Sequence, residues 1–428
     1  MLDDIEDVSA AMFWRELLEA DTDAHSVVEQ PLKIPFVAGA VLYANDTKSD
    51  VGQEFASRAQ PEVQQALDTG DWRSFKLLLR FLALLSPMFE EDGVVPILDE
   101  LFNRAVDLQT ASSEDAVGLE LVKIILFTIP YLLVNAPENP TLQQRASELL
   151  EKTEIVASAP HTLEALVDPY PTIEEGQEKP MSFGSVLLLL QRQLQAEASN
   201  GWPLACIPRV FNPSAKANGK PDSESNGDAN GDAEHTSTKH AFPNVAVPSP
   251  VNPGPVNLFP EVFFSVYADQ DIESVPPTSN VASSLIRDAI KDTINILDYN
   301  RNAVSKILIE QDNYWSPGIF TRRETQFDKL RDFSEGVSTW KPEDVGIDTI
   351  FSQIMLLPTP EHRLVYYHSI VTELCKLSPG AIAPSLGRAI RFLFRSLEAM
   401  DLELAYRFMD WFAHHLSNFE FRWKWGEW

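Results

Sequence analysis

Apolar residues recur every three or four positions along most of this 428-residue chain. That spacing places them on one face of an α-helix, so the pattern predicts amphipathic helices. Asp71 can cap such a helix by accepting a hydrogen bond from a free backbone N–H group, and Pro87 can end it. The stripe between these two residues consists of Trp72, Phe75, Leu79, Leu82 and Leu85.

Further stripes follow after short polar breaks. We expect helices from about residue 91 to 108, from about 114 to Pro130, where the proline kinks or ends the helix, and over 141–152, 161–167 and 181–196. Loops of two to six residues make neighbouring helices antiparallel. Since no alternating strand pattern of any length appears, we predict an all-α fold, an alpha-solenoid of antiparallel helix pairs of the HEAT or armadillo type with middle-domain-like modules.

The composition changes between residues 212 and 257. This segment holds seven Pro, seven Asn and four Gly, and no Leu, Ile, Met, Trp or Tyr. It cannot build a core, so we expect disorder at least as far as about Pro243. The predicted organisation is a first helical domain over 1–200, a linker over 201–275 that contains the disordered insertion 212–257, and a second helical domain over 276–428.

The helical pattern resumes at about Val281. Apolar stripes then recur over 364–375, 382–400 and 404–419, whereas 316–348 is weaker and we expect it to be irregular in places. A dense aromatic run ends the sequence, from Phe419 to Trp428. A domain seldom leaves so many aromatic rings uncovered, so we expect the second domain to be incomplete at its C-terminal end.

Charge changes the picture by region. The formal net charge of the chain is −29. Residues 1–280 carry 43 acidic and 17 basic side chains, whereas residues 281–428 carry 20 and 17. Such a chain does not wrap nucleic-acid phosphates over a broad surface, although a local basic patch remains compatible with it.

Other features exclude several protein classes. Two distant cysteines exclude a secreted disulfide framework and an all-cysteine zinc site, which favours a reducing compartment. The first thirty residues hold nine acids and one base, unlike a signal peptide. The longest apolar stretch, Ile124 to Val134, is shorter than the roughly 20 residues that span a bilayer, so no membrane partner is expected.

Catalytic chemistry is not indicated. The chain shows no glycine-rich phosphate loop, no Gly-x-Ser-x-Gly elbow and no His-Glu-x-x-His helix. His414 and His415 are adjacent and point about 100° apart on a helix, so we interpret them, and His368, as core or capping residues. We therefore expect no catalytic residue, no cofactor and no metal; an enzyme would need a site assembled from distant residues.

Basic and aromatic residues of the second domain are the candidates for binding a partner. Arg388, Arg391 and Arg395 occupy positions i, i+3 and i+7 of one helix. Arginine binds carboxylates and phosphates with two hydrogen bonds, so this stripe is either an ordinary solvated face or a dock for an acidic partner segment or an RNA backbone. The predicted partner-binding set is Arg388, Arg391, Arg395, Arg422, Trp423 and Trp425.

The segment from Phe408 to Trp425 reads FMDWFAHHLSNFEFRWKW. It closely resembles the Trp-Phe-x-His-His-Leu-Ser-Asn-Phe-x-Phe-x-Trp-x-Trp run in the large subunit of the eukaryotic nuclear cap-binding complex. Residues 373–380, ELCKLSPG, also resemble that family, and 77–81 and 103–108 resemble its fungal members. Residues 30–195 are similar to the middle-domain module of the translation scaffold factor four gamma.

The resemblance implies a scaffold without a catalytic step. The family's large subunit holds a small RRM subunit that stacks the 7-methylguanosine cap, and it recruits splicing, export and decay factors. Capped RNA would then be contacted mostly indirectly, and the acidic first domain would attract basic export or splicing factors. The resemblance also implies a nuclear location, with shuttling to the cytoplasm as a further expectation.

Two departures from the family pattern stand out. The family's third helical domain and its basic N-terminal arm, which carries an import signal, have no counterpart in this sequence, so nuclear location depends on the resemblance alone. An alternative function is a translation-initiation or RNA-decay scaffold that binds an RNA helicase through its first domain. The aromatic run disfavours that alternative.

Overall fold

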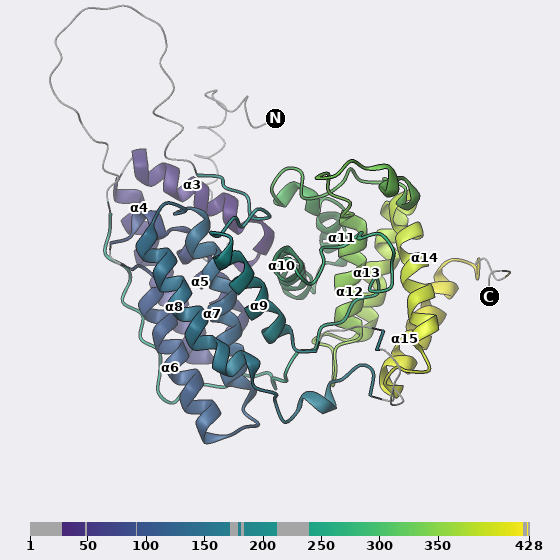
Figure 1. Ribbon diagram of the computed structural model, residues 1–428, viewed down its shortest axis with the longest axis horizontal. Coiled ribbons are helices and arrows are strands. Elements are labelled where there is room, and N and C mark those ends of the chain that lie inside the picture. Colours follow the sequence, from purple (N-terminus) through teal and green to yellow (C-terminus); the bar gives the residue numbers. More distant parts are fainter. Residues whose placement is uncertain are drawn as a thin grey trace, which may run out of the picture.

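The structure is a computed structural model that describes residues 28–47, 49–90, 92–171, 179–180, 184–211, 239–422 and 426. Within these ranges the chain is helical and contains no strand, only two isolated bridges, Phe89 with His240 and Ser185 with Val262. The helices form two groups that lie side by side in Figure 1, a first helical region (α3–α9) and a second helical region (α10–α15). This arrangement confirms the predicted all-α solenoid of antiparallel helix pairs.

The first helical region starts with the short 3₁₀ helix η1, Pro31–Lys33. Its α-helices are α3 Ile34–Thr47, α4 Ser49–Thr69, α5 Trp72–Leu84, α6 Val95–Ala111, α7 Ala116–Val134, α8 Pro140–Ser158 and α9 Val186–Ser199. Asp71 caps α5 by accepting a bond from Ser74 N, as predicted, and Asn139 caps α8 in the same way. The stretch 161–167 contains only the 3₁₀ turn Glu164–Leu166, so the helix predicted there is absent.

Helix α7 is the central element of the first helical region. It is apolar on all sides, packs against α5, α6 and α8, and runs past Pro130 to Val134. The described residues contain one helix long and apolar enough to cross a membrane, and it is α7; 78% of its most apolar window is buried inside the fold. The core of a protein produces the same pattern, and we interpret α7 as a core helix.

Residues 239–257 are the main correction to the sequence prediction. They lie against α4, α5 and α6 instead of being disordered: Gln60 and Gln64 donate to the carbonyl oxygens of Asn244 and Ala246, and Trp72 Nε1 donates to Pro253 O. The polar helix side chains satisfy the backbone groups that this proline-rich segment cannot pair within itself. Residues 212–238 lie outside the described part of the chain.

The second helical region follows the predicted stripes. Its helices are α10 Ala282–Ile296, α11 Arg301–Ile309, α12 Pro342–Ile354, α13 Leu364–Leu377, α14 Pro379–Ser396 and α15 Leu402–Asn418. Residues 316–341 are irregular, as expected, except for the 3₁₀ helix Phe327–Asp332. Arg407 on α15 donates to the carbonyl oxygens of Ile354, Leu356 and Pro358, so it caps the C-terminal end of α12 from a buried position.

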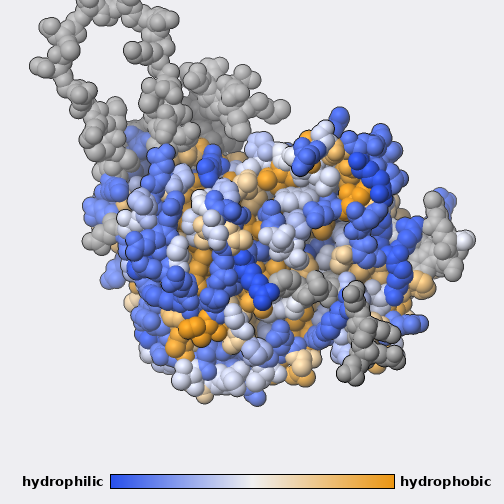
Figure 2. Space-filling model, viewed as in Figure 1, coloured by the Kyte–Doolittle hydropathy of each residue, from blue (hydrophilic) through white to orange (hydrophobic). Residues whose placement is uncertain are grey.

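One continuous hydrophobic core runs through both regions. The segment after α8 extends from the first helical region to the second: the Tyr170 ring stacks on Phe264 with centroids 6.3 Å apart, and Pro169 O accepts a bond from Asp401 N at the start of α15. The face seen in Figure 2 is largely hydrophilic over the first helical region, with small hydrophobic patches. The predicted boundaries at 200 and 276 stay predictions, but the regions they separate share a core.

Candidate partner-binding surface and the junction that supports it

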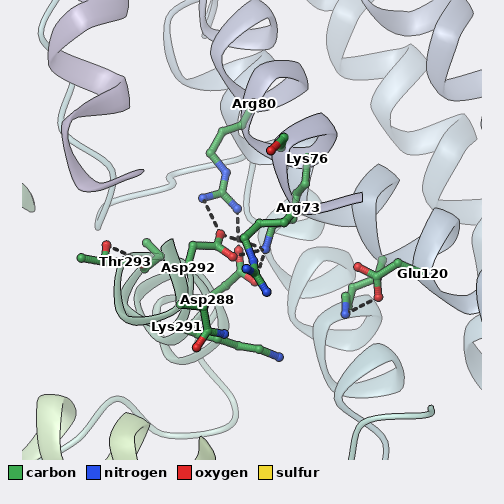
Figure 3. Close-up of polar contacts among 12 residues, drawn as sticks. Arg73, Lys76, Arg80, Glu120, Asp288, Lys291, Asp292 and Thr293 are labelled. Atoms are coloured by element: carbon green, nitrogen blue, oxygen red, sulfur yellow. Dashed lines mark hydrogen bonds and ion pairs between the residues drawn. The ribbon is translucent and has the colours of Figure 1, made fainter. Parts of the chain in front are cut away.

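The two helical regions meet where α5 faces α10, through buried charged side chains (Figure 3). Lys76 Nζ lies 2.7 Å from Asp288 Oδ1 and 2.9 Å from Asp292 Oδ2. Arg80 Nη2 lies 2.5 Å from Asp288 Oδ2. All four residues are at most 7% exposed. We call this group the junction cluster.

A third helix completes the junction cluster. Lys76 lies over the ring of Phe127 on α7 at 5.4 Å, and Arg80 lies over the ring of Tyr131 at 4.7 Å. Aromatic faces attract cations, so these rings satisfy the sides of the two cations that the carboxylates do not reach. The cations on α5 and the rings on α7 are each four residues apart, and so are the carboxylates Asp288 and Asp292 on α10; three helix faces therefore meet in register.

Burial opposes ionisation of both carboxylates, but their pKa values shift in opposite directions. Burial opposes ionisation of Asp288, but Lys76 and Arg80 outweigh it and hold its pKa well below the usual range. Burial and the neighbouring charge of Asp288 raise the pKa of Asp292. Asp288 is therefore the carboxylate that carries the ionic contact between the two regions.

Sequence reasoning missed the junction cluster, although a signal was present. Lys76 and Arg80 interrupt the apolar stretch of α5, and both sit on buried positions of that helix. A charge within an apolar stripe requires a partner of opposite charge. The acids four residues apart on α10 are the matching signal, but the sequence alone does not connect positions 212 residues apart.

A second ionic group fixes the segment that leads into α10. Glu261 lies 2.8 Å from Lys291 Nζ on α10 and 3.7 Å from Lys123 Nζ on α7. Burial opposes its ionisation, but the two lysines outweigh burial and lower the pKa of Glu261 to about 2. Nearby, Asp348 on α12 accepts bonds from Ser265 Oγ and Val266 N.

Glu261 should make the fold sensitive to acid. A carboxyl whose pKa falls from about 4.3 in the unfolded chain to about 2 in the fold contributes stability above pH 4.3 and loses it as the pH falls towards 2. Glu261→Gln should therefore lower stability at pH 7 and flatten the loss between pH 4 and 2. Urea unfolding at stepped pH measures this. Exposed Glu151→Gln is the control, and parallel pH curves for Glu261→Gln and the wild type would contradict the prediction.

The predicted arginine stripe does not form one solvated face. Arg388 lies 2.5 Å from Asp344 Oδ2, whose side chain is fully buried, and its guanidinium carbon is 4.1 Å from the centre of the Phe327 ring. Arg391 is half-buried, whereas Arg395 is exposed and lies 2.5 Å from Asp269. Arg388 therefore belongs to the core of the second helical region.

The segment from Phe408 to Trp425 also contains both buried and exposed positions. Trp411 is fully buried and meets the Phe351 ring edge-on at 4.8 Å, and His415 is 8% exposed between Trp411 and Phe419. Trp411 and His415 therefore pack in the core, which confirms the interpretation of His415 as a core residue. Arg422 is exposed and pairs with Glu420 at 2.7 Å. Trp423 and Trp425 lie outside the described residues. Partner binding by the six candidates stays a prediction, and one of them, Arg388, already pairs with Asp344; the six are Arg388, Arg391, Arg395, Arg422, Trp423 and Trp425.

His368, His415 and both cysteines are shielded from solvent by the core. Within the described ranges, no group of three or more His, Cys, Asp or Glu side chains could hold a metal ion. His368 and His415 are buried, and burial lowers the pKa of each to about 4. Both cysteines are buried, and burial raises the pKa of each thiol to about 12, which makes them unreactive.

Comparison with known proteins finds one matching family model and several similar proteins. Residues 276–428 match the family model described as MIF4G like. The chain is 29% identical to nuclear cap-binding protein complex subunit 1 of Saccharomyces cerevisiae over 94% of its length and 48% of that relative. It is 27% identical to nuclear cap-binding protein subunit 1 of Schizosaccharomyces pombe, over 93% of the chain and 48% of the relative.

The human protein of that name is 43% identical over 82 residues, which are 19% of this chain and 10% of the human one. The chain thus spans about half the length of the yeast relatives that it matches. The similarity includes both helical regions, whereas the family model covers the second. This chain is similar to subunit 1 of yeast nuclear cap-binding complexes over most of its own length, and its residues 276–428 match the MIF4G-like family model.

Proposed function

We propose that this chain acts as a scaffold in a nuclear cap-binding complex. It supports an RRM-type small subunit that binds the 7-methylguanosine cap, and it has no catalytic step of its own. The observation that carries the proposal is the similarity to large subunits of this complex over 94% of the chain. The proposed location is the nucleus, with mRNA splicing, export and decay factors as further partners.

The physical properties of the chain support an indirect contact with RNA. Its net charge of −29 disfavours binding of cap and RNA phosphates. Three cations form ion pairs inside the fold and are not free for RNA phosphates: Lys76, Arg80 and Arg388 all pair with buried carboxylates. A stack of helices instead offers long surfaces for proteins. We therefore place RNA recognition in the small subunit and protein recruitment in this chain.

Co-purification with the small RRM subunit, followed by binding of a cap analogue, tests the proposal. We expect the small subunit to associate with this chain and the isolated chain to show no measurable affinity for 7-methyl-GTP. Calorimetry with 7-methyl-GTP and with GTP separates cap recognition from general nucleotide binding. Tight cap binding by the isolated chain would overturn the scaffold role, and binding of an RNA helicase but not of the small subunit would favour the translation or decay scaffold.

A further inference from the structure

A pocket of about 460 Å³ lies where the C-terminal ends of α13 and α15 meet the first half of α14. Pockets of this size take a large side chain or a small ligand. Its lining combines apolar side chains, Cys375, Leu386 and Phe419, with polar ones, His415, Asn418, Glu420 and Arg422.

The beginning of α14 forms one edge of this pocket. Ser378 occupies the N-cap position but its side chain makes no capping bond, and Pro379, which lines the pocket, has no N–H. Gly380 is exposed, with no atom within 4 Å of the place where a Cβ would stand. The positive end of this 18-residue helix is therefore uncapped and open, which favours a negatively charged group.

His415 supplies an independent sign of a missing ligand. It lines the pocket and is 8% exposed, yet its Nδ1 is buried without a hydrogen-bond partner. Burial, together with the neighbouring His414, lowers the pKa of His415 to about 4, so the ring is neutral at pH 7 and offers one donor and one acceptor. A buried polar atom without a partner costs free energy, and a polar ligand group would remove that cost.

The lining of the pocket includes one cation and one carboxylate, Arg422 and Glu420, whose side chains are 82% and 74% exposed. Exposed Lys376, at the end of α13, follows the lining residue Cys375 in the chain. Arg422 pairs with Glu420, but an exposed pair of this kind contributes little and exchanges readily for another carboxylate. The apolar lining residues disfavour an RNA phosphate as the main occupant, because a phosphate would leave their apolar surface exposed to water.

We propose that this pocket binds a short acidic segment of a partner protein, which inserts one large apolar side chain against Leu386 and Phe419 and places a carboxylate between Arg422 and the N-terminus of α14. The main-chain or side-chain polar groups of the segment pair with His415 and Asn418. This binding goes beyond the cap-complex role and does not depend on it, because the lining residues named above all belong to this chain.

Synthetic peptides test the proposal on the whole chain. The probes are labelled ten-residue peptides with blocked termini, each with one phenylalanine or leucine beside two aspartates. Two control sets replace the aspartates by lysine or the apolar residue by alanine. Fluorescence anisotropy should show binding on the order of 10–100 µM for the acidic apolar set and none for either control set.

Three variants locate the site. Ala383 is exposed on the pocket wall, so Ala383→Trp should fill the pocket and abolish binding. Arg422→Glu should weaken binding by roughly fivefold or more, and its exposed position keeps the fold intact. Arg58→Glu makes the same charge change on α4, at an exposed position outside the pocket and outside the predicted partner-binding set, and should alter binding by less than about twofold.

The outcomes separate cleanly. Loss of binding in Ala383→Trp and Arg422→Glu, with Arg58→Glu unaffected, supports the pocket. No binding of any acidic apolar peptide up to 1 mM, or equal binding of the lysine set, overturns the proposal. Binding of a single-stranded RNA oligonucleotide that Ala383→Trp abolishes, without peptide binding, would also overturn it. Because the cap complex is not assembled in this experiment, its result is independent of the proposed function.

Discussion

Asp288→Ala is expected to lower the free energy of unfolding by roughly 3–5 kcal/mol, the cost typical of breaking a buried ion pair. The variant removes the carboxylate that Lys76 and Arg80 share at 2.7 and 2.5 Å. Asp292 cannot compensate both cations, because one carboxylate carries one negative charge; it lies 2.9 Å from Lys76 Nζ but 3.9 Å from Arg80 Nη1. Urea unfolding followed by circular dichroism at pH 7 measures the loss.

Two controls make this result specific. Asp271→Ala removes an exposed acid, 63% accessible, that also pairs with a distant arginine, Arg331, and it should change stability by less than about 1 kcal/mol. Replacing Lys76 and Arg80 by Met and both aspartates by Leu removes every charge of the junction cluster. That variant should be more stable than Asp288→Ala, because the main cost is an uncompensated buried cation and not the loss of the ion pairs themselves.

An Asp288→Ala protein as stable as the wild type would show that water or a side-chain movement solvates Lys76 and Arg80. The junction cluster would then be a consequence of α5 and α10 packing and not a support for it. A loss as large in Asp271→Ala would point to a general effect of removing acids from this chain.

The sequence predicted local features well, because local physics decides them. The stripe after Asp71 became α5 with Asp71 as its cap, and the stripe before Phe419 became α15. These outcomes depend on residues within a few turns of one another. The predicted helix at 161–167 did not form. The segment makes only the 3₁₀ turn Glu164–Leu166 and then continues to Tyr170, which lies in the shared core.

Long-range pairing is where sequence reasoning stopped. Composition predicted disorder into 239–257, but it could not reveal that Gln60 and Gln64, some 180 residues earlier, bond its backbone, or that Phe242 packs against the core. The arginine stripe shows the same limit. Positions i, i+3 and i+7 share a helix face, yet the sequence does not say that buried Asp344 lies against the first of them, Arg388.

Arg388→Ala is expected to destabilise the fold by roughly 3–5 kcal/mol, and not only to weaken partner binding. Asp344 is fully buried, and Arg388 reaches its two carboxylate oxygens at 2.6 and 2.5 Å. Without Arg388, Asp344 retains the Ser385 hydroxyl as a donor and an uncompensated charge. The guanidinium also lies 4.1 Å from the centre of the Phe327 ring, so its loss removes packing as well.

The pH dependence identifies the cause of this loss. Burial already raises the pKa of Asp344, and removing Arg388 should raise it further. A carboxyl with a raised pKa stabilises the fold when protonated and loses that contribution as the pH rises through its folded pKa. The deficit of Arg388→Ala should therefore be smaller at pH 5 than at pH 7, and Asp344→Asn in the same chain should restore part of it at pH 7.

Arg395→Ala is the matched control on the same helix. Its side chain is 63% exposed and its partner Asp269 is 39% exposed, so the change should cost less than about 1 kcal/mol. If Arg388→Ala were as mild as Arg395→Ala at both pH values, Arg388 would be available for a partner after all. If instead only Arg388→Ala unfolds, partner-binding measurements on this helix must use Arg395, because a loss of binding at Arg388 would report the fold and not the interface.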